Sequence, residues 1–217
     1  MKKNYLNKRV CKAFCLFLIC CTLPLKTIAQ DYTSGSSVLR AFSVKTNLLY
    51  DAAMIPNLGF EFAFPTHWSL SGSWNYAWWS NYNKHRFWRT YGGELEARKW
   101  FGRYAQEEDV LKGQHTGLFI MAGTYDFEHG HTGYMNDLYF GIGVSYGYAL
   151  SLTKNLSLDF VIGVGYLCGT YQKYRPQNNG YCIIDSKNLS YFGPIKAEIS
   201  LVWTIDRFIN KKRGGIK

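Results

Sequence analysis

Two histidines and two acidic residues lie close together in the middle of the chain, where they are the best local candidate for chemistry. Asp126, Glu128, His129 and His131 offer the nitrogen and oxygen ligands that bind transition metals. A catalytic site would instead need a nucleophile beside a positioned base, and no such pair or metal-ligand spacing accompanies them. We therefore expect a polar turn with no catalytic residue, no metal and no cofactor, and we favour a protein that is not an enzyme.

The segments around this cluster are predicted to be strands, because apolar side chains recur at every second position. The clearest example is the stretch 138–166, where two alternating runs flank the turn Thr153-Lys154-Asn155 and predict a hairpin. Further strands are predicted at 42–50, 57–64, 68–78, 88–101, 117–127 and 195–205. The polar segments between them are predicted to be loops, among them 80–87, 102–113, 129–137 and 169–189, of which the last is the longest.

About eight strands of this length predict an all-β fold, an eight-stranded antiparallel up-and-down transmembrane β-barrel. One face of each run carries Leu, Ile, Val, Phe or Trp, and the other carries mostly Gly, Ser, Thr and Asn. A soluble barrel would need a charged outer face, so we assign the bulky face to lipid and the small face to the interior. Most tryptophans fall near predicted strand ends, as interfacial girdles require: Trp68, Trp78, Trp79, Trp88, Trp100 and Trp203.

Charged side chains occur among the small residues of the predicted interior, where an ion without a partner is costly. We predict one mixed network that plugs the lumen and consists of Lys45, Glu61, Glu94, Glu96, Arg98, Asp159, Lys196 and Glu198. The interior of an eight-stranded barrel holds side chains but no water channel. A general porin is therefore disfavoured.

The N-terminus is typical of an export signal. Basic residues precede an apolar segment, 13–25, that is too short to span a bilayer as a helix, and Thr27-Ile28-Ala29 is a suitable cleavage site. Cleavage removes six basic and no acidic residues, so the formal net charge falls from +10 to +4. The predicted divisions are a signal peptide (1–29), a linker (30–40), the barrel (41–206) and a basic tail (207–217). We expect the mature protein in the outer membrane of a Gram-negative bacterium and, lacking a basic stripe, without a nucleic-acid partner.

Two cysteines, Cys168 and Cys182, remain after the signal is removed. In an oxidising envelope compartment, two cysteines of one loop region are a disulfide candidate. Closing such a loop contributes about 3 kcal/mol in the chain-entropy model. Two reduced thiols are the alternative, and a metal site would need more ligands than this pair supplies.

Several runs within the predicted strands carry a resemblance to known proteins. They are KTNLLYDA (45–52), NLGFE (57–61), EAR (96–98), GVSYGY (143–148) and YFGPIKA (191–197). Together they resemble the Bacteroidota envelope proteins grouped as the domain of unknown function 3575, over residues 42–203. The resemblance implies an outer-membrane β-barrel with no established activity, so no catalytic residue is transferred. Association of some members with fimbrial or surface-assembly genes implies a candidate assembly partner.

The predicted loops are the remaining candidates for function. With both termini in the periplasm, the loops at 80–87, 129–137 and 169–189 lie outside the cell, and they contain aromatic and basic residues of the kind that often anchor binding interfaces. The predicted contact residues are Arg86, Tyr171, Tyr174 and Arg175. The sequence thus predicts a small, plugged barrel that contacts outer-membrane lipid and has a structural, surface-binding or assembly role. The alternatives are a lipid-modifying enzyme of the outer membrane and a soluble lipocalin-like binder of an apolar ligand.

Overall fold

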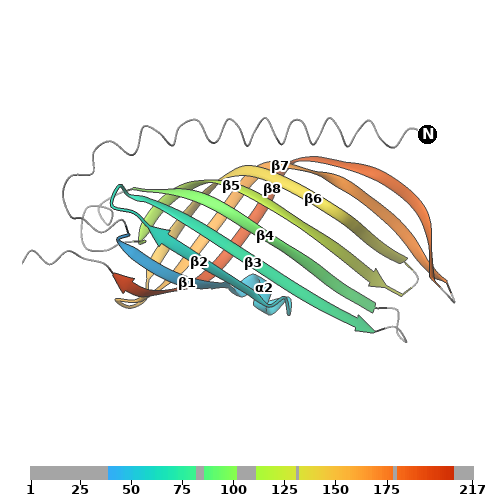
Figure 1. Cartoon of the computed structure of the whole chain (residues 1–217), viewed down its shortest axis with the longest axis horizontal. Helices are drawn as coiled ribbons and strands as arrows, with labels where there is room; N and C mark the ends of the chain where they lie inside the picture. The colour runs from blue at the N-terminus through green and yellow to red at the C-terminus, as the bar shows by residue number, and fades with distance from the viewer. Residues whose placement is uncertain (1–38, 82–85, 102–110, 131, 178–179, 208–217) are drawn as a thin grey trace, which may run out of the picture. The chain divides into compact units, whose positions relative to one another are not determined.

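Eight antiparallel strands form the barrel, and each pairs with the next one in the chain. The computed structural model describes residues 39–81, 86–101, 111–130, 132–177 and 180–207. The strands are β1 (Ala41–Asn47), β2 (Asn57–Ala63), β3 (Trp68–Asn81), β4 (Arg86–Phe101), β5 (Gly113–His129), β6 (Thr132–Ser151), β7 (Leu156–Gln177) and β8 (Gly180–Arg207). Pairing of β1 with β8 closes the sheet into a barrel (Figure 1). The predicted all-β, up-and-down architecture is confirmed.

Side-chain burial follows the period of two that the sequence displays. Along β1 the inward residues are buried and those between them are half-buried. On β6 and β7, Phe140 and Ile162 expose 38% and 69% of their surface, whereas Ser145 and Asp159 are buried. The bulky apolar side chains therefore point outward, and the small and charged ones point into the barrel.

The strands are longer than the sequence predicts: the predicted loops at 129–137 and 169–189 are wrong, and the ends of the predicted loop at 80–87 belong to strands, while residues 82–85 lie outside the described residues. The hairpin at 138–166 is confirmed by the pairing of β6 with β7. However, most of the described residues in 80–87, 129–137 and 169–189 belong to strands. In two of these segments an irregularity in register interrupts the alternation, between Asn136 and Tyr139 and between Lys173 and Tyr174. A bulge adds a residue without ending the pairing, so a broken period of two did not mean a loop.

The barrel wall is much shorter on one side. β1 and β2 have seven residues each, whereas β7 and β8 have 22 and 28. The short helix α2 (Leu48–Ala52) follows β1 and precedes β2, at the lower edge of the barrel in Figure 1. A helix is about 10 Å wide, which matches the width of two strands about 4.8 Å apart. α2 is thus the right size to fill the wall where β1 and β2 end.

Polar side chains hold this helical connection in place. Asn47 caps α2 by accepting a hydrogen bond from the backbone N–H of Leu49. The carboxylate of Asp51 accepts hydrogen bonds from the hydroxyl of Thr46 and the amide of Asn57, both at 2.8 Å. The connection is therefore tied to both short strands. Among the residues that the structure describes, no helix combines the length and apolarity needed to cross a bilayer.

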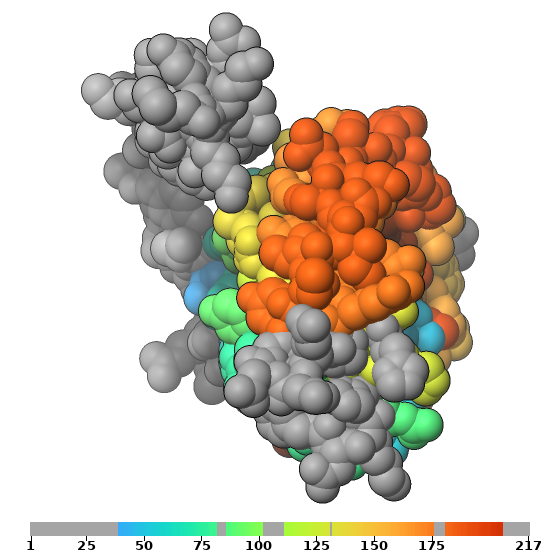
Figure 2. Space-filling model, turned by 90° about the vertical axis from the view of Figure 1, so that its right-hand side faces the viewer, coloured from blue at the N-terminus to red at the C-terminus, as the bar shows by residue number. Residues whose placement is uncertain are grey.

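The hairpin of β7 and β8 extends beyond the rest of the barrel. The last pair of β6 with β7 is Gly133 with Tyr174, whereas β7 and β8 pair as far as Gln177 and Gly180. Viewed from this end, the orange and red atoms of the hairpin occupy much of the face (Figure 2). We call this end of the barrel the mouth.

The register of this hairpin separates the two cysteines. Cys168 pairs with Ser190 and Cys182 with Arg175, so the cysteines lie seven positions apart along the hairpin. That is about 23 Å at 3.3 Å per residue, whereas a disulfide needs Cα atoms about 4.4–6.8 Å apart. Both cysteines are free, and the predicted disulfide is wrong. The predicted signal peptide, and nearly all of the predicted linker and basic tail, lie outside the described residues.

Candidate functional site

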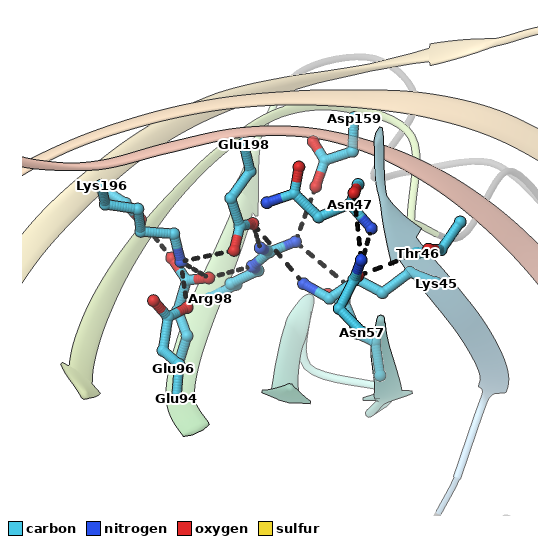
Figure 3. Close-up of polar contacts among 12 residues, drawn as sticks. Lys45, Thr46, Asn47, Asn57, Glu94, Glu96, Arg98, Asp159, Lys196 and Glu198 are labelled. Carbon is cyan, nitrogen blue, oxygen red and sulfur yellow. Dashed lines mark hydrogen bonds and ion pairs between the residues drawn. The ribbon is translucent and has the colours of Figure 1, made fainter. Parts of the chain in front are cut away.

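The interior of the barrel is built around Arg98 of β4, which is fully buried. Its Nε donates to Glu96 Oε2 at 2.7 Å, and its Nη1 donates to Glu61 Oε2 at 3.2 Å and Asp159 Oδ2 at 2.8 Å. Its Nη2 lies 3.6 Å from Glu198 Oε2. One guanidinium thus joins carboxylates from β2, β4, β7 and β8 (Figure 3). Planar, multidentate contacts of this kind suit arginine better than lysine.

Two lysines complete the network on either side of Arg98. Lys196 Nζ bonds to Glu94, lies 2.8 Å from Glu96 Oε2, and lies 3.8 Å from Glu198 Oε1. Lys45 Nζ lies 3.9 Å from Glu198 Oε2. The structure therefore brings all eight residues of the predicted lumen network into one cluster, which we call the charge plug (Figure 3).

Sequence reasoning missed several polar residues of the charge plug. One of them is His115, which is fully buried and whose Nε2 lies 2.9 Å from Asp159 Oδ1. Ser145 donates a hydrogen bond to Glu96, and Ser69 donates one to Glu61 at 2.6 Å. The period of two along β5 could have predicted that His115 points inward, because it is in phase with the buried Phe119.

Trp100 also belongs to the interior and not to an interfacial girdle as predicted. Its Nε1 donates to the hydroxyl of Ser69 at 2.8 Å, and its ring centroid lies 4.5 Å from that of His115. The residue is buried. The sequence could have predicted that Trp100 points inward, because it is in phase with Glu96 and Arg98 along β4.

Little space remains inside the charge plug. A cavity of about 10 Å³ is lined by Lys45, Asn47, Tyr50, Asn57, Gly59, Ser73, Trp74, Glu198 and Ser200. That volume holds about one water molecule. The carboxylates are engaged by cations or hydroxyls, so the arrangement suits a rigid core that fixes strand positions better than acid–base chemistry.

The predicted contact residues lie on strands, where the structure gives them different roles. Tyr174 is buried, and its hydroxyl donates to Asp126 Oδ1 at 2.6 Å and Glu128 Oε2 at 3.0 Å. It is therefore not an exposed anchor, and this prediction is wrong. Arg86 and Arg175 are exposed, and Tyr171 is half-buried.

The same contacts account for the acidic residues beside the histidines. Asp126 and Glu128 bind Tyr174, and Asp126 also forms an ion pair with Arg89 at 3.1 Å. His131 lies outside the described residues. Within the described part of the chain, no three His, Cys, Asp or Glu residues are placed to hold a metal.

The tryptophans divide between the two faces of the barrel wall. Trp68, Trp78 and Trp203 are outward and exposed, as a girdle requires. Trp79 and Trp88 pair directly across β3 and β4, in unbroken register with the buried pair Ser71 and Glu96. Since alternation puts them on the inner face, the prediction that they contact lipid is wrong.

Comparison with known proteins identifies one family. A model of the family described as "Protein of unknown function (DUF3575)" matches residues 14–205. No curated protein matches the chain, and no solved structure does.

Proposed function

The chain belongs to the DUF3575 family of proteins of unknown function, and we propose that it is an outer-membrane β-barrel with a structural or surface-binding role. The observation that carries the proposal is a continuous apolar band on the outside of a barrel whose inside is charged. Along β6 the outward residues of this band are all exposed: Leu138, Phe140, Ile142, Val144, Tyr146, Tyr148 and Leu150. In water, a contiguous apolar surface of this kind would promote aggregation.

The height of the band matches a bilayer. Residues 138–150 span about 40 Å along the strand at 3.3 Å per residue. At the tilt of about 40° usual for such barrels, the band is about 30 Å high, which is the thickness of a hydrocarbon core. Outward aromatic residues, including Trp68 and Trp203 near one end and Trp78 near the other, are positioned as interfacial girdles.

The charge plug argues for a role other than conduction or the enclosure of an apolar ligand. A lipocalin-like binder would need an apolar interior, but the groups buried here include Lys45, Glu61, Arg98, Asp159 and Lys196. The cavity beside Lys45 and Glu198 has room for about one water molecule, which is too little for a solute. A surface-binding role would then fall to the outer ends of the strands, and above all to the long hairpin of β7 and β8.

Cell fractionation followed by gel electrophoresis with and without heating tests the proposal. We expect the protein in the outer-membrane fraction, with an unheated form that migrates faster than the heated one because the barrel stays folded. Recovery in the soluble periplasmic fraction would overturn the proposal.

A charge placed on the apolar band sharpens the test. Ile162 is outward and exposed, so Ile162→Arg should destabilise a membrane barrel by about 2–4 kcal/mol near the bilayer midplane. In a soluble barrel the same change would be harmless. Asn155→Arg, in the exposed turn between β6 and β7, is the matched control. Equal yields of folded protein from both variants in lipid vesicles would count against membrane insertion.

A further inference from the structure

Two exposed tryptophans at the mouth have no role in the barrel as described so far. Trp79 and Trp88 pair directly across β3 and β4, and they expose 53% and 43% of their surface. Because both lie on the inner face, contact with lipid does not account for them. Their neighbour Trp78, on the outer face, stacks beside Tyr76 and suits the girdle.

Both rings are held in place by contacts within the chain. Trp79 Nε1 donates to the carbonyl of Met54, in the connection between α2 and β2, at 2.8 Å. The centroid of the Trp88 ring lies 4.6 Å from that of Phe127 on β5. Aromatic side chains fixed in this way lose little conformational entropy when a ligand binds.

These rings line a recess of about 560 Å³ near the ends of β3, β4 and β5. Its lining mixes aromatic and polar residues: Trp78, Trp79, Ser80, Asn81, Arg86, Phe87, Trp88, Glu128 and His129. The volume falls within the range of small-ligand sites, which are mainly apolar with a few polar groups. Arg86 and His129 pair across β4 and β5, so both stand beside the tryptophans.

A row of aromatic rings leads from the recess toward the charge plug. From Trp88 the row continues through Phe127 and Tyr125 to Tyr139, with centroids 4.6, 5.4 and 6.3 Å apart. Asn136 pairs with Tyr125 across β5 and β6. It is 2% exposed, and its side-chain amide has no hydrogen-bond partner among the described residues. A buried amide of this kind is costly unless a ligand or solvent group satisfies it.

We propose that the recess and the aromatic row bind a saccharide. Sugar rings have apolar C–H faces that stack on flat aromatic side chains, and their hydroxyls both donate and accept hydrogen bonds. Exposed tryptophans beside Arg86 and His129, together with the amide of Asn136 opposite Tyr125 in the aromatic row, match both properties. An acyl chain would leave these polar groups without partners. The inference rests on the proposed function only for the position of the recess on the cell surface.

Titration of the full-length protein with defined sugars tests the inference. The probes are linear hexasaccharides of glucose, mannose, galactose and N-acetylglucosamine, in a detergent without a sugar head group. Tryptophan fluorescence and saturation-transfer NMR report binding. We expect saturable binding of at least one hexasaccharide, weakened about tenfold by Trp88→Ala, because central aromatic anchors dominate binding energy. Trp203→Ala, an exposed outward tryptophan that does not line the recess, is the control and should leave the affinity unchanged.

Folding of each variant is checked by heat-modifiable migration. If Trp88→Ala does not fold, Trp88→Phe retains the contact with Phe127 and should still weaken binding. The inference fails if no hexasaccharide binds at about 10 mM, where sites of millimolar affinity are filled. It also fails if Trp88→Ala binds the hexasaccharide as tightly as the wild type does. Recovery of the protein in a soluble fraction would refute the membrane proposal without affecting this titration.

Discussion

The inner wall of this barrel carries opposite chemistry at its two ends. Around the charge plug the wall is a complete ring of eight strands, and its inward residues are ions and hydroxyls such as Arg98, Glu96 and Ser69. At the mouth, β1 and β2 have ended, and the inward residues are aromatic, as Trp79, Trp88 and Phe127 show. One period of two along the strands therefore produces both the charged inner wall of the plug and the aromatic inner wall of the mouth.

This difference shows that the need of an inward side chain for an internal partner depends on whether the ring of strands around it is complete. Within the complete ring, side chains are removed from water, so each charge must find a partner and each small residue leaves room for one. At the mouth, inward side chains remain partly exposed, so they need no internal partner and can meet a ligand. Substitutions at the two ends should therefore have unequal costs.

The largest effect is expected when Arg98 is replaced by methionine. The change leaves the carboxylates of Glu61, Glu96, Asp159 and Glu198 buried without their shared cation. Breaking a buried ion pair from one side costs about 3–5 kcal/mol. Urea unfolding in lipid vesicles, followed by tryptophan fluorescence, measures the loss of free energy of unfolding.

Lys187→Met is the control from the mouth end. Lys187 pairs with Asp185 at 2.9 Å, but both side chains are exposed, so the loss should be far smaller than that of Arg98→Met. Equal losses in the two variants would contradict the contrast between the closed ring and the mouth.

The second prediction concerns how tightly the closed ring is packed. A Cβ at Gly117 would lie 2.6 Å from the hydroxyl of Ser145 and would also clash with Glu96. Gly117→Ala should therefore cost about 1–3 kcal/mol, the usual effect of overpacking. A Cβ at Gly72 would meet only the flexible end of Leu95, at 3.3 Å. Gly72→Ala should be close to neutral in the same unfolding assay, and a similar loss there would point to a general intolerance of alanine in strands.

Much of the barrel could be predicted from the sequence because alternation is a local signal. The strands, their up-and-down order and the eight charged members of the plug follow from which residues share a phase. Arg98 and Glu96 stand out because a charge among small residues is rare in such a pattern. What the pattern does not contain is the pairing of each cation with its carboxylates, which depends on the register between strands.

Two failures of prediction come from a change of phase, and a third comes from judging by residue type alone. Between Asn136 and Tyr139 an irregularity in register interrupts the period of two, so continuous strand was interpreted as loop. Cys168 and Cys182 were paired for the same reason, since a loop would let them meet and a hairpin does not. Trp79 and Trp88 were assigned by residue type to a lipid girdle, although the phase of β3 and β4 places them inside.

The smallest expected effect tests how the mouth end is held together. The hydroxyl of Tyr174 donates to Asp126 and Glu128, in the part of β7 beyond the apolar band. Removing hydrogen bonds to charged acceptors costs about 1.5–3 kcal/mol when they are buried, and Tyr174→Phe should fall toward the lower limit because Asp126 retains Arg89. Hydrogen exchange of the β7–β8 hairpin measures this local stability, with the exposed Tyr181→Phe as the control.

The pH dependence of this contact has a definite sign. Burial raises the pKa of Tyr174 above its ordinary value of 10.0, and the hydrogen bonds to the two carboxylates raise it further. Since the folded state holds the proton more tightly than the unfolded state, the contribution of Tyr174 is complete below pH 10.0 and declines as the pH rises above it. The difference in hairpin stability between the wild type and Tyr174→Phe should therefore be constant near neutrality and shrink in strong alkali. A difference that instead grew with pH would mean that the hydroxyl does not donate to these carboxylates.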